Sequence, residues 1–490
     1  MSNGARDKRG GQGGPRGAGG GPRGAGEHRG GQGAHVGAGP RPDGGVEGRR
    51  AAIGAREVAR RVLDRVHKDK AWATPALDGE LARAGLADRD RRLASELVYG
   101  VLRHRTRIDR ALAAHADLKK TPPRVVTALR LAAYQLLFLD RIPGYAAIDD
   151  AVNAARVAGG PKLGGFANAV LRKLSTSGEP SIQEQGLDRI VVEHSLPRWI
   201  LDELAPAADD SVPALTAAPQ PQPQPTPRLT PSELAAAFAQ PAPIIARANV
   251  RRTTREALAA ELEKTGVTTT PIASAPAALR LEGLGDPSRN DSFNAGRWTV
   301  QDTGAQLVAL AARPLATMKI LDACAGVGGK STHLAELTDD EATIDAADLS
   351  KTKLGLLAET AERLGLASIR RHVCDLLDPA APLARDYDLI VLDAPCSGLG
   401  VLRRHPDAKW RLTASDVPRL ADLQRQLLDA VVPRLAPGGT LVYSVCTFTR
   451  AEGPEQIRAL VARTGLRLVE EHRTWPPDAD AFYLARLERS

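Results

Sequence analysis

Two cysteines, Cys396 and Cys446, are the side chains of this chain best suited to chemistry. Cys396 follows the predicted strand 387–393, which contains the apolar run 389–392, and Cys446 closes the predicted strand 439–446. Neighbouring strands lie about 4.8 Å apart. If the two strands are adjacent and parallel, both thiols meet at the carboxyl edge of the sheet, where open α/β sheets bind ligands. Two thiols at one edge predict covalent catalysis.

A thiol pair of this kind suits the methylation of a pyrimidine at carbon 5, which is a weak nucleophile. A thiolate that adds to carbon 6 pushes electron density onto carbon 5, and a base must then remove the carbon-5 proton so that the thiol leaves. One thiol would add and the other would assist release. A free cysteine has a pKa of about 8.5 and is mostly protonated at pH 7. We therefore expect Lys330 or a helix N-terminus to lower the pKa of the attacking thiol.

A glycine-rich loop lies upstream, in the segment 320–331 that runs from a predicted strand into a predicted helix. Glycines let the backbone approach a ligand closely, and a helix N-terminus offers free N–H groups. A P-loop needs glycine six residues before Lys330, where this chain has Cys324, and the dinucleotide pattern starting at Gly326 ends on Ser331 instead of glycine. A ligand with a ribose and a base but no phosphate fits better, and S-adenosylmethionine is such a ligand.

Three aspartates end predicted strands on the same edge. Asp348 follows the loop by about 20 residues, which suits hydrogen bonds to ribose hydroxyls. Asp375 closes the next strand and would lie near an adenine, and Asp393 directly precedes the Cys396 segment. A single aspartate at such a position is usually a turn residue, but three of them on one edge indicate a ligand site.

The segments that position these residues alternate between strand and helix from Trp298 to the C-terminus, which predicts an α/β fold with a doubly wound parallel sheet. The predicted strands are 318–323, 343–348, 368–373, 387–393, 439–446, 465–470 and 481–487. The predicted helices are 302–313, 330–337, 351–364, 416–435 and 452–463.

The segment before this sheet, 51–178, is predicted to be an all-helical domain, because its apolar residues recur three and four apart and no strand pattern interrupts them. Thr121 with two following prolines predicts the cap and first turn of a helix that continues to Leu139. Basic side chains cluster at Arg91-Arg92, at 103–110 and at Lys119-Lys120. Each cluster alone is typical of a solvated helix face, and together they would form a patch facing RNA.

Three further segments complete the predicted organisation. Residues 1–50 are rich in glycine and hold nine basic and four acidic side chains, so we expect a disordered tail that either aids solubility or attracts a polyanion weakly. Residues 179–243 form a connector with an extended Pro-Gln linker at 217–227. Residues 244–300 form a small α+β module with strands at 244–250 and 278–281 and a helix at 255–264, and the domain with the sheet spans 301–490.

The bulk composition excludes several classes of protein. The 490 residues suffice for about three domains, and the formal net charge is +8. The four cysteines form no C-x-x-C pair, so neither zinc nor a disulfide framework is expected. No apolar run reaches the about 20 residues of a membrane span, and no signal peptide is visible, so we expect a cytoplasmic protein with free thiols.

The chain resembles the Sun/RsmB family of RNA cytosine-5 methyltransferases from Ala51 to its C-terminus. The resemblance in the catalytic half rests on segments 322–330, 393–398, 405–407 and 437–444 and on Cys446. In the helical half, segments 129–137 and 165–172 are similar to NusB-type RNA-binding domains.

This resemblance implies methylation of carbon 5 of a cytosine in ribosomal RNA of the small subunit, with S-adenosylmethionine as the cofactor. It implies that Cys446 is the nucleophile and that Cys396 helps to release the product. It also implies ribosomal RNA as the partner, a Rossmann-like methyltransferase sheet and a monomer without a metal. Asp393 either contacts the cofactor or faces the cytosine ring. The cofactor-binding residues it implies are Cys324, Ala325, Gly326, Val327, Gly328, Gly329, Lys330, Asp348, Asp375 and Asp393.

Two other functions are compatible with parts of the sequence. A P-loop-like ATPase is favoured by the resemblance of 387–393 to a Walker B strand, but Cys324 occupies the place of a required glycine. A non-enzymatic RNA-binding or antitermination factor with an inactive methyltransferase fold would be expected to have lost a thiol or the glycine-rich loop, and both are present. DNA is a less suitable substrate than RNA, since the helical domain and the small module resemble RNA-binding parts.

Overall fold

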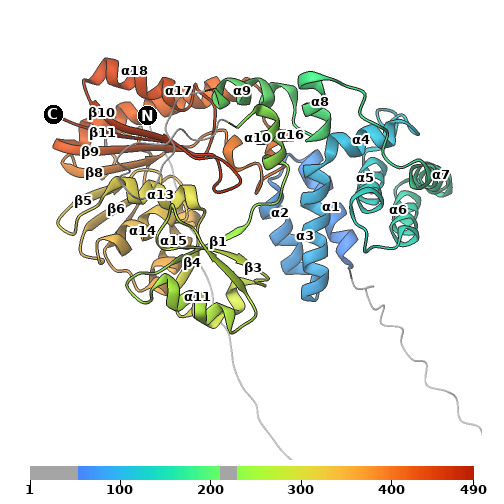
Figure 1. The fold of residues 1–490 in the computed structure, drawn as a ribbon, viewed down its shortest axis with the longest axis horizontal. Coiled ribbons are helices and arrows are strands. Elements are labelled where there is room, and N and C mark those ends of the chain that lie inside the picture. The colour runs from blue at the N-terminus through green and yellow to red at the C-terminus, as the bar shows by residue number, and fades with distance from the viewer. Residues whose placement is uncertain (1–52, 210–228) are drawn as a thin grey trace, which may run out of the picture. The chain divides into compact units, whose positions relative to one another are not determined.

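Three groups of secondary structure follow one another along the chain (Figure 1). The computed structural model describes residues 53–209 and 229–490. The predicted tail at 1–50 and the Pro-Gln linker at 217–227 lie outside the described residues.

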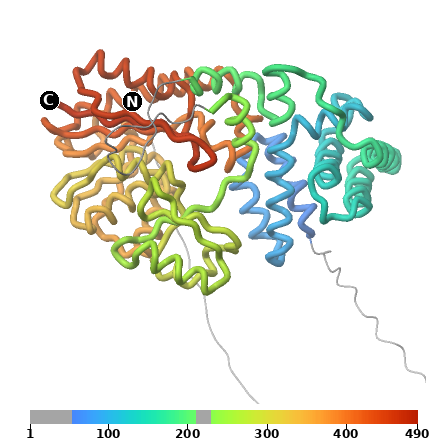
Figure 2. Tube along the Cα trace, in the orientation of Figure 1, coloured from blue at the N-terminus to red at the C-terminus, as the bar shows by residue number. Residues whose placement is uncertain are grey.

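The first group consists of helices, as predicted. Figure 2 shows α1 to α7 gathered side by side, from the blue to the green part of the tube. No helix in the described parts of the chain is both long and apolar enough to cross a membrane. The helices are α1 (Ala55–Lys68), α2 (Ala73–Ala84), α3 (Asp88–Arg103), α4 (Arg105–Ala113), α5 (Pro123–Phe138), α6 (Gly144–Gly159) and α7 (Pro161–Ser177).

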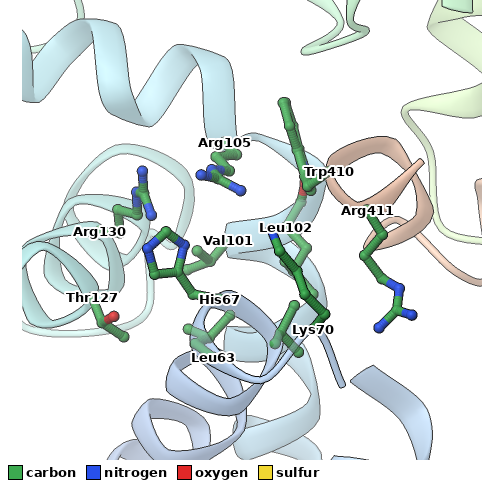
Figure 3. Close-up of a pocket in the computed structure, with 11 residues that line it drawn as sticks. Leu63, His67, Lys70, Val101, Leu102, Arg105, Thr127, Arg130, Trp410 and Arg411 are labelled. Atoms are coloured by element: carbon green, nitrogen blue, oxygen red, sulfur yellow. The ribbon is translucent and has the colours of Figure 1, made fainter. Parts of the chain in front are cut away.

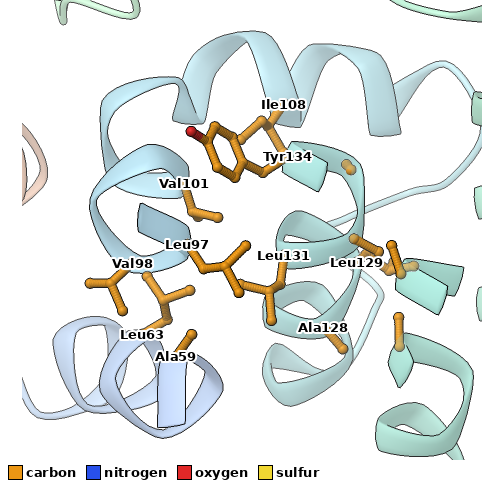
Figure 4. Close-up of a cluster of buried hydrophobic side chains, with 14 of the residues drawn as sticks. Ala59, Leu63, Leu97, Val98, Val101, Ile108, Ala128, Leu129, Leu131 and Tyr134 are labelled. Carbon is orange, nitrogen blue, oxygen red and sulfur yellow. The ribbon is translucent and has the colours of Figure 1, made fainter. Parts of the chain in front are cut away.

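The core of this helical block is built from side chains spaced three and four apart on α1, α3 and α5 (Figure 4). Val58 and Val62 on α1 are fully buried, as are Leu97 on α3 and Leu129 on α5. Burial of one such side chain stabilises the fold by about 1.5–3 kcal/mol. The apolar periodicity therefore accounts for both the helices and their packing.

The prediction that Thr121 caps α5 is wrong. The N-cap is Pro122, and no side chain caps the helix. Thr121 instead donates its hydroxyl to the Asp117 carbonyl at 2.8 Å. Pro123 occupies the first turn, where its fixed φ and missing N–H cost nothing, so the two prolines start the helix without a capping hydroxyl.

Three helices in the predicted connector pack against the catalytic half. Leu201 and Leu204 share a buried cluster with Leu399 and Phe448, which lie in the segments after Cys396 and Cys446. The connector thus supports the edge of the sheet that carries the thiols. These helices are α8 (Gly186–Glu193), α9 (Arg198–Ala208) and α10 (Pro231–Phe238).

The small module has a four-stranded antiparallel sheet in the order β2-β3-β1-β4. Two strands and the main helix match the predicted ranges, whereas β2 and β4 were not predicted, because one is four residues long and ends in proline and the other has three residues. The elements are β1 (Ile244–Ala248), α11 (Arg255–Glu263), β2 (Thr268–Pro271), β3 (Ala278–Glu282), η1 (Pro287–Arg289), α12 (Asp291–Asn294) and β4 (Trp298–Val300).

The third group is a seven-stranded sheet in the order β10-β11-β9-β8-β5-β6-β7. Its strands are β5 (Lys319–Asp322), β6 (Thr343–Asp348), β7 (Ile369–Val373), β8 (Tyr387–Asp393), β9 (Leu435–Val445), β10 (Arg467–Arg473) and β11 (Tyr483–Glu488). Its helices are α13 (Thr303–Ala312), α14 (Gly329–Leu337), α15 (Lys351–Leu364), η2 (Leu399–Val401), α16 (Ala408–Arg411), α17 (Asp416–Val431), η3 (Val432–Arg434) and α18 (Pro454–Thr464).

The sheet is not parallel throughout, which corrects one expectation. β5 to β9 pair in parallel, but β11 runs antiparallel to both β9 and β10. A parallel crossover needs a connection of a dozen or more residues, usually a helix. The segment 474–482 between β10 and β11 is shorter than that and has no helix, so the two strands pair as neighbours in opposite directions.

Helices cover both faces of the sheet, as a doubly wound fold requires. Leu389 and Val391 on β8 pack in one cluster with residues of α13 and α14. Ile390 and Leu392 point to the opposite face and pack with residues of α17 and α18. The alternation of side chains along a strand thus places β8 in the centre of the core and fixes its carboxyl end.

The helical block contacts the catalytic half through α16 and the residues before it. Trp410 donates its indole N–H to the Leu102 carbonyl at 2.7 Å, and Lys409 Nζ donates to the Arg103 carbonyl at 2.9 Å. The backbone N–H of Ala73 donates to the buried Asp407 carboxylate at 3.0 Å. We call this contact the seam.

The seam corrects the prediction for one residue of the basic cluster at 103–110, Arg103. Arg103 is buried and donates to the Arg403 carbonyl at 3.2 Å, so it does not face solvent. Arg107 is paired with Glu179, and Arg110 donates to the carbonyls of Pro180 and Ser181. These arginines hold parts of the chain together.

Candidate active site

The carboxyl ends of β8 and β9 bring Cys396 and Cys446 together. The register pairs Asp393 with Ser444, and the Ala394 N–H donates to the Ser444 carbonyl at 2.9 Å. Both chains then leave the sheet side by side, and the two sulfur atoms lie 3.3 Å apart. Both side chains are partly exposed, so a ligand can reach them.

The two thiols are not equivalent. The hydrogen bond with Cys446, followed by burial, raises the pKa of Cys396 well above its ordinary value. Cys396 therefore keeps its proton at neutral pH and is available to donate a hydrogen bond to the other sulfur.

Lys330 and Asp393 form an ion pair beside the thiols. Lys330 Nζ lies 2.6 Å from Asp393 Oδ2, and Ser444 donates its hydroxyl to Asp393 Oδ1 at 2.9 Å. Burial is the largest single effect and lowers the pKa of Lys330, but the charge and hydrogen bond of Asp393, together with the charges of Asp322 and Cys446, outweigh it and raise the net pKa. A fixed ammonium therefore stands within electrostatic reach of the Cys446 sulfur.

The glycine-rich loop connects β5 to α14 and is anchored to β6. Gly328 adopts a positive φ of 85°, and a Cβ there would lie 2.0 Å from Leu357 Cδ1, so only glycine fits against α15. Gly326 also has a positive φ, but a Cβ there would meet no atom within 4 Å. The Gly326 N–H donates to Asp348 Oδ2 at 3.0 Å. The loop is thus tightly packed at one glycine and open at the other.

The remaining predicted residues of the loop differ in exposure. Cys324 is partly exposed, and burial raises the pKa of its thiol. Ala325 is buried and donates its N–H to the Ala347 carbonyl at 2.9 Å, while the Val327 side chain is 54% exposed and Gly329 is partly exposed at the start of α14.

Asp348 and Asp375 lie at the ends of adjacent strands but have different partners. Asp348 accepts from the loop and from the Ser350 N–H at 2.8 Å. Asp375 is exposed and accepts from the Leu377 N–H at 2.9 Å, as a turn residue does. Within residues 53–209 and 229–490, no hydrogen bond joins Asp375 to the loop.

Three exposed apolar side chains lie at the carboxyl ends of neighbouring strands, which sequence reasoning missed. Val327, Leu349 and Val373 are 54%, 72% and 54% exposed, and each belongs to the carboxyl edge formed by β5, β6 and β7. A contiguous group of exposed apolar side chains often marks a ligand-binding surface. The position of Leu349 directly after Asp348 was the available signal.

Sequence reasoning also missed Glu452, which ties the two cysteine segments together. Its buried carboxylate accepts from the Ser397 N–H at 2.8 Å and from the Ser397 hydroxyl at 2.6 Å. It also accepts from the hydroxyl of Thr449 at 2.8 Å and from the side-chain amide of Gln424 at 3.0 Å. Ser397 directly follows Cys396, and Thr449 lies three residues after Cys446. One carboxylate therefore binds both cysteine segments.

Family models match three parts of the chain. The model described as 16S rRNA methyltransferase RsmB/F matches residues 308–488, and the NusB family model matches residues 54–176. A model for the ferredoxin-like domain of RsmF/B-like methyltransferases matches residues 227–286.

Curated proteins match over most of their length. The probable ribosomal RNA small subunit methyltransferase B of Synechocystis is 34% identical over 429 residues, which cover 86% of this chain and 90% of that protein. The ribosomal RNA small subunit methyltransferase B of Vibrio cholerae is 35% identical, covering 83% of this chain and 92% of that protein. The crystal structure of PH0851 shares the fold, with a TM-score of 0.73 at 22% identity over 89% of this chain and 98% of that one.

Proposed function

Because the chain belongs to the RsmB/F family of ribosomal RNA methyltransferases, we propose that it methylates carbon 5 of a cytosine in small-subunit ribosomal RNA through a transient bond from Cys446. The observation that carries this proposal is the pair of sulfur atoms 3.3 Å apart at the carboxyl edge of the sheet, beside the glycine-rich loop. The thiol pair favours methylation at carbon 5, since methylation of a base nitrogen or of a ribose hydroxyl needs no thiol.

The residues at the loop fit S-adenosylmethionine, which supplies, when bound, a methyl group on a positively charged sulfur. Gly326 leaves open space, and the exposed side chains of Val327, Leu349 and Val373 offer apolar surface for an adenine ring. Asp348 accepts a hydrogen bond from the loop and is our candidate partner for the ribose hydroxyls. Asp375 is our candidate for the adenine side of the same ligand, while Cys324, Ala325, Gly328, Gly329 and Lys330 shape the loop.

The first step assigns the nucleophile. Cys396 keeps its proton because its pKa is raised, and it donates that proton in a hydrogen bond to Cys446. Cys446 attacks as its thiolate after its proton has passed to solvent, with the Lys330 ammonium within electrostatic reach of its sulfur. Its sulfur bonds to carbon 6 of the cytosine, and the electron pair of the 5,6 double bond moves toward carbon 5, which becomes nucleophilic.

The bond from Cys446 changes the acidity of Cys396. The largest cause of the raised pKa of Cys396 is its hydrogen bond with Cys446, with the charge of the Cys446 thiolate acting in the same direction. A thioether at Cys446 removes that charge and weakens that hydrogen bond. The pKa of Cys396 then falls, and the partly exposed thiol can lose its proton to water.

Release completes the cycle. Once carbon 5 has gained the methyl group, the Cys396 thiolate takes the carbon-5 proton. The electrons of that C–H bond restore the 5,6 double bond, and the sulfur–carbon bond breaks to return the Cys446 thiolate. Cys396 ends as the thiol, so the thiol–thiolate pair is restored and each turnover passes one proton to solvent.

Of the two roles open to Asp393, we propose contact with the substrate rather than with the cofactor. Its carboxylate is already held by Lys330 and Ser444 on the thiol side of the loop. We assign Asp393 to the cytosine ring, where a carboxylate can steady the ring nitrogen and amino group while charge moves.

The direct test is methylation of unmodified small-subunit ribosomal RNA in vitro, with nucleoside analysis of the product. We expect 5-methylcytidine from the wild type and at least a 1,000-fold lower rate from Cys446→Ala, a loss typical of a removed covalent nucleophile. Cys374→Ala is the matched control, because Cys374 packs partly buried against the core at the end of β7. A methylated product other than 5-methylcytidine, or equal rates for Cys446→Ala and Cys374→Ala, would refute the proposal.

A further inference from the structure

A cavity of about 90 Å³ lies at the seam, between the helical block and α16 (Figure 3). Its walls come from α1, α3, α4 and α5 on one side and from Trp410 and Arg411 of α16 on the other. A single water molecule needs about 10–15 Å³ of such space. The cavity therefore has room for a group the size of a phosphate together with water.

The cavity is lined by five basic side chains. Among the described residues that line it there is no carboxylate. In Figure 3 the side chains of His67, Arg105 and Arg130 lie around one part of the cavity, with Lys70 beside them. The basic lining residues are His67, Lys70, Arg105, Arg130 and Arg411.

Nearby acidic groups do not balance this charge. Arg130 and Arg105 share one carboxylate, Asp109, which lies 2.6 Å from Arg130 Nε and 3.7 Å from Arg105 Nε. In the described part of the chain, Lys70 has no ion pair. The pKa of His67 is lowered by burial and then by the charges of Arg105, Arg130 and Lys70, as expected where positive charge is in excess.

Arg411 gives an independent sign of a missing partner. Its Nε and Nη1 atoms are buried, and neither has a hydrogen-bond partner among residues 53–209 and 229–490. Its guanidinium lies over the Trp72 ring at 3.9 Å, which fixes the side chain in place. Buried donors of this kind usually have an acceptor, and a bound anion would supply one.

Lys70 is unusual for its position. It directly follows the C-cap of α1 and has a positive φ of 54°. Glycine is the common residue in this conformation after a helix. The turn itself therefore does not explain a lysine there, whereas a charge held at the cavity does.

We propose that this cavity binds a backbone phosphate of the substrate RNA. The proposal rests on the proposed function, because it assumes that RNA is the substrate. A phosphate diester carries one negative charge and accepts several hydrogen bonds, which suits a lining of guanidinium, ammonium and imidazole groups. Free phosphate has the same chemistry and is the competing source.

The place of the cavity explains why RNA is favoured over free phosphate. α16 begins twelve residues after Cys396, and the segment between them contacts the helical block through Asp407. A phosphate bound between Arg411 and the helical block would therefore contact the same chain segment that begins at Cys396. Such a contact would fix the register of the RNA relative to the target cytosine without reading the RNA sequence.

The test is the salt dependence of RNA binding, measured by filter binding of the full chain to unmodified small-subunit ribosomal RNA. The slope of log Kobs against log salt is negative, and we expect Lys70→Gln to make it less steep by about 0.7 to 0.9, the effect of one lost phosphate contact. Lys68→Gln is the matched control, since Lys68 is exposed at the end of α1, two residues before Lys70, and does not line the cavity. Lys70→Gly should show the same loss of slope while its thermal midpoint stays equal to or above that of the wild type, because glycine suits the turn.

Equal slopes for Lys70→Gln, Lys70→Gly and Lys68→Gln would overturn the proposal. If inorganic phosphate shifts the His67 imidazole signals while these slopes stay equal, the cavity takes a free anion and the assignment to RNA is wrong. If inorganic phosphate at constant ionic strength competes with RNA for the wild type but not for Lys70→Gln, the proposal is supported. Binding is measured without methyl transfer, so this result is independent of whether the chain forms 5-methylcytidine.

Discussion

Cys396 and Cys446 differ in their surroundings, and this difference assigns different chemistry to two identical side chains. The raised pKa of Cys396 depends on Cys446, while Lys330 acts on Cys446. In our proposal the protonated thiol first donates a hydrogen bond to its partner, which attacks. After it has lost its own proton, it takes the carbon-5 proton. The sequence predicted both cysteines because each follows an apolar strand, but it could not predict the raised pKa of Cys396, which arises first from its contact with Cys446, 50 residues away.

Glu452 provides a prediction at the same scale. Its carboxylate accepts four hydrogen bonds in a buried site. Glu452→Gln replaces one acceptor oxygen with a donor, which leaves a buried donor facing another donor and costs about 1–3 kcal/mol of unfolding free energy. We expect kcat to fall at least tenfold, with the KM for S-adenosylmethionine unchanged, because the thiols lose their alignment.

Steady-state kinetics and thermal unfolding of Glu452→Gln and Glu455→Gln measure this. Glu455 is an exposed carboxylate in the first turn of α18 and serves as the control. An active Glu452→Gln with wild-type kcat would show that the carboxylate does not position the cysteine segments.

At the scale of elements, the sequence predicts strands well where an apolar run ends in aspartate. β6 and β8 have the predicted bounds, because a buried apolar run followed by Asp348 or Asp393 marks where the strand ends. The antiparallel direction of β11 was missed, although the short connection from β10 excludes a crossover. Glu452 was missed as well, since its partners lie in α17 and in the two loops that follow β8 and β9, and no local pattern marks it.

Gly328 provides a prediction for the loop element. Gly328→Ala would place a Cβ 2.0 Å from Leu357 and would hold a left-handed backbone at a cost of about 1–2 kcal/mol. The loop must shift, so we expect the Kd for S-adenosylmethionine in titration calorimetry to rise at least tenfold.

Gly355→Ala is the matched control on the neighbouring helix α15. A Cβ at Gly355 meets no atom within 4 Å, and alanine in a helix interior is favoured by about 0.5–1 kcal/mol. We expect Gly355→Ala to raise the thermal midpoint without changing the Kd. Equal Kd values for both variants would contradict the role of the loop.

At the scale of the whole molecule, the seam joins the helical block to the catalytic half through buried polar groups. Lys409 is buried there, and burial, followed by the charge of Arg103, lowers its pKa to about 7. The matches to separate family models agree with a chain of several parts. The division at residues 50, 178, 243 and 300 stays a proposal, since α8 to α10 pack against the catalytic half.

Lys409 predicts how stability depends on pH. In the unfolded chain a lysine has a pKa of about 10.4, so between pH 7 and 10 the unfolded state binds a proton that the folded state does not. Stability therefore rises with pH across this window, by up to about 1.4 kcal/mol per pH unit, and is level below pH 7. We expect the thermal midpoint of the wild type to rise from pH 7.5 to 9.5 and Lys409→Met to lose most of this rise.

Lys68→Met, which changes an exposed lysine, should keep the wild-type slope. If Lys409→Met and Lys68→Met have the same pH dependence, the seam lysine is protonated in the folded state and the explanation is wrong.

The central claim, a bond from Cys446 to the cytosine, is tested most directly by isolating that bond. Cys396→Ala removes the group that takes the carbon-5 proton, so the methylated adduct should accumulate when RNA and S-adenosylmethionine are both present. Nuclease and protease digestion followed by mass spectrometry should then find a methylated cytidine on the peptide that contains Cys446. A nucleotide attached to any other residue, or full turnover by Cys396→Ala without an adduct, would contradict the claim.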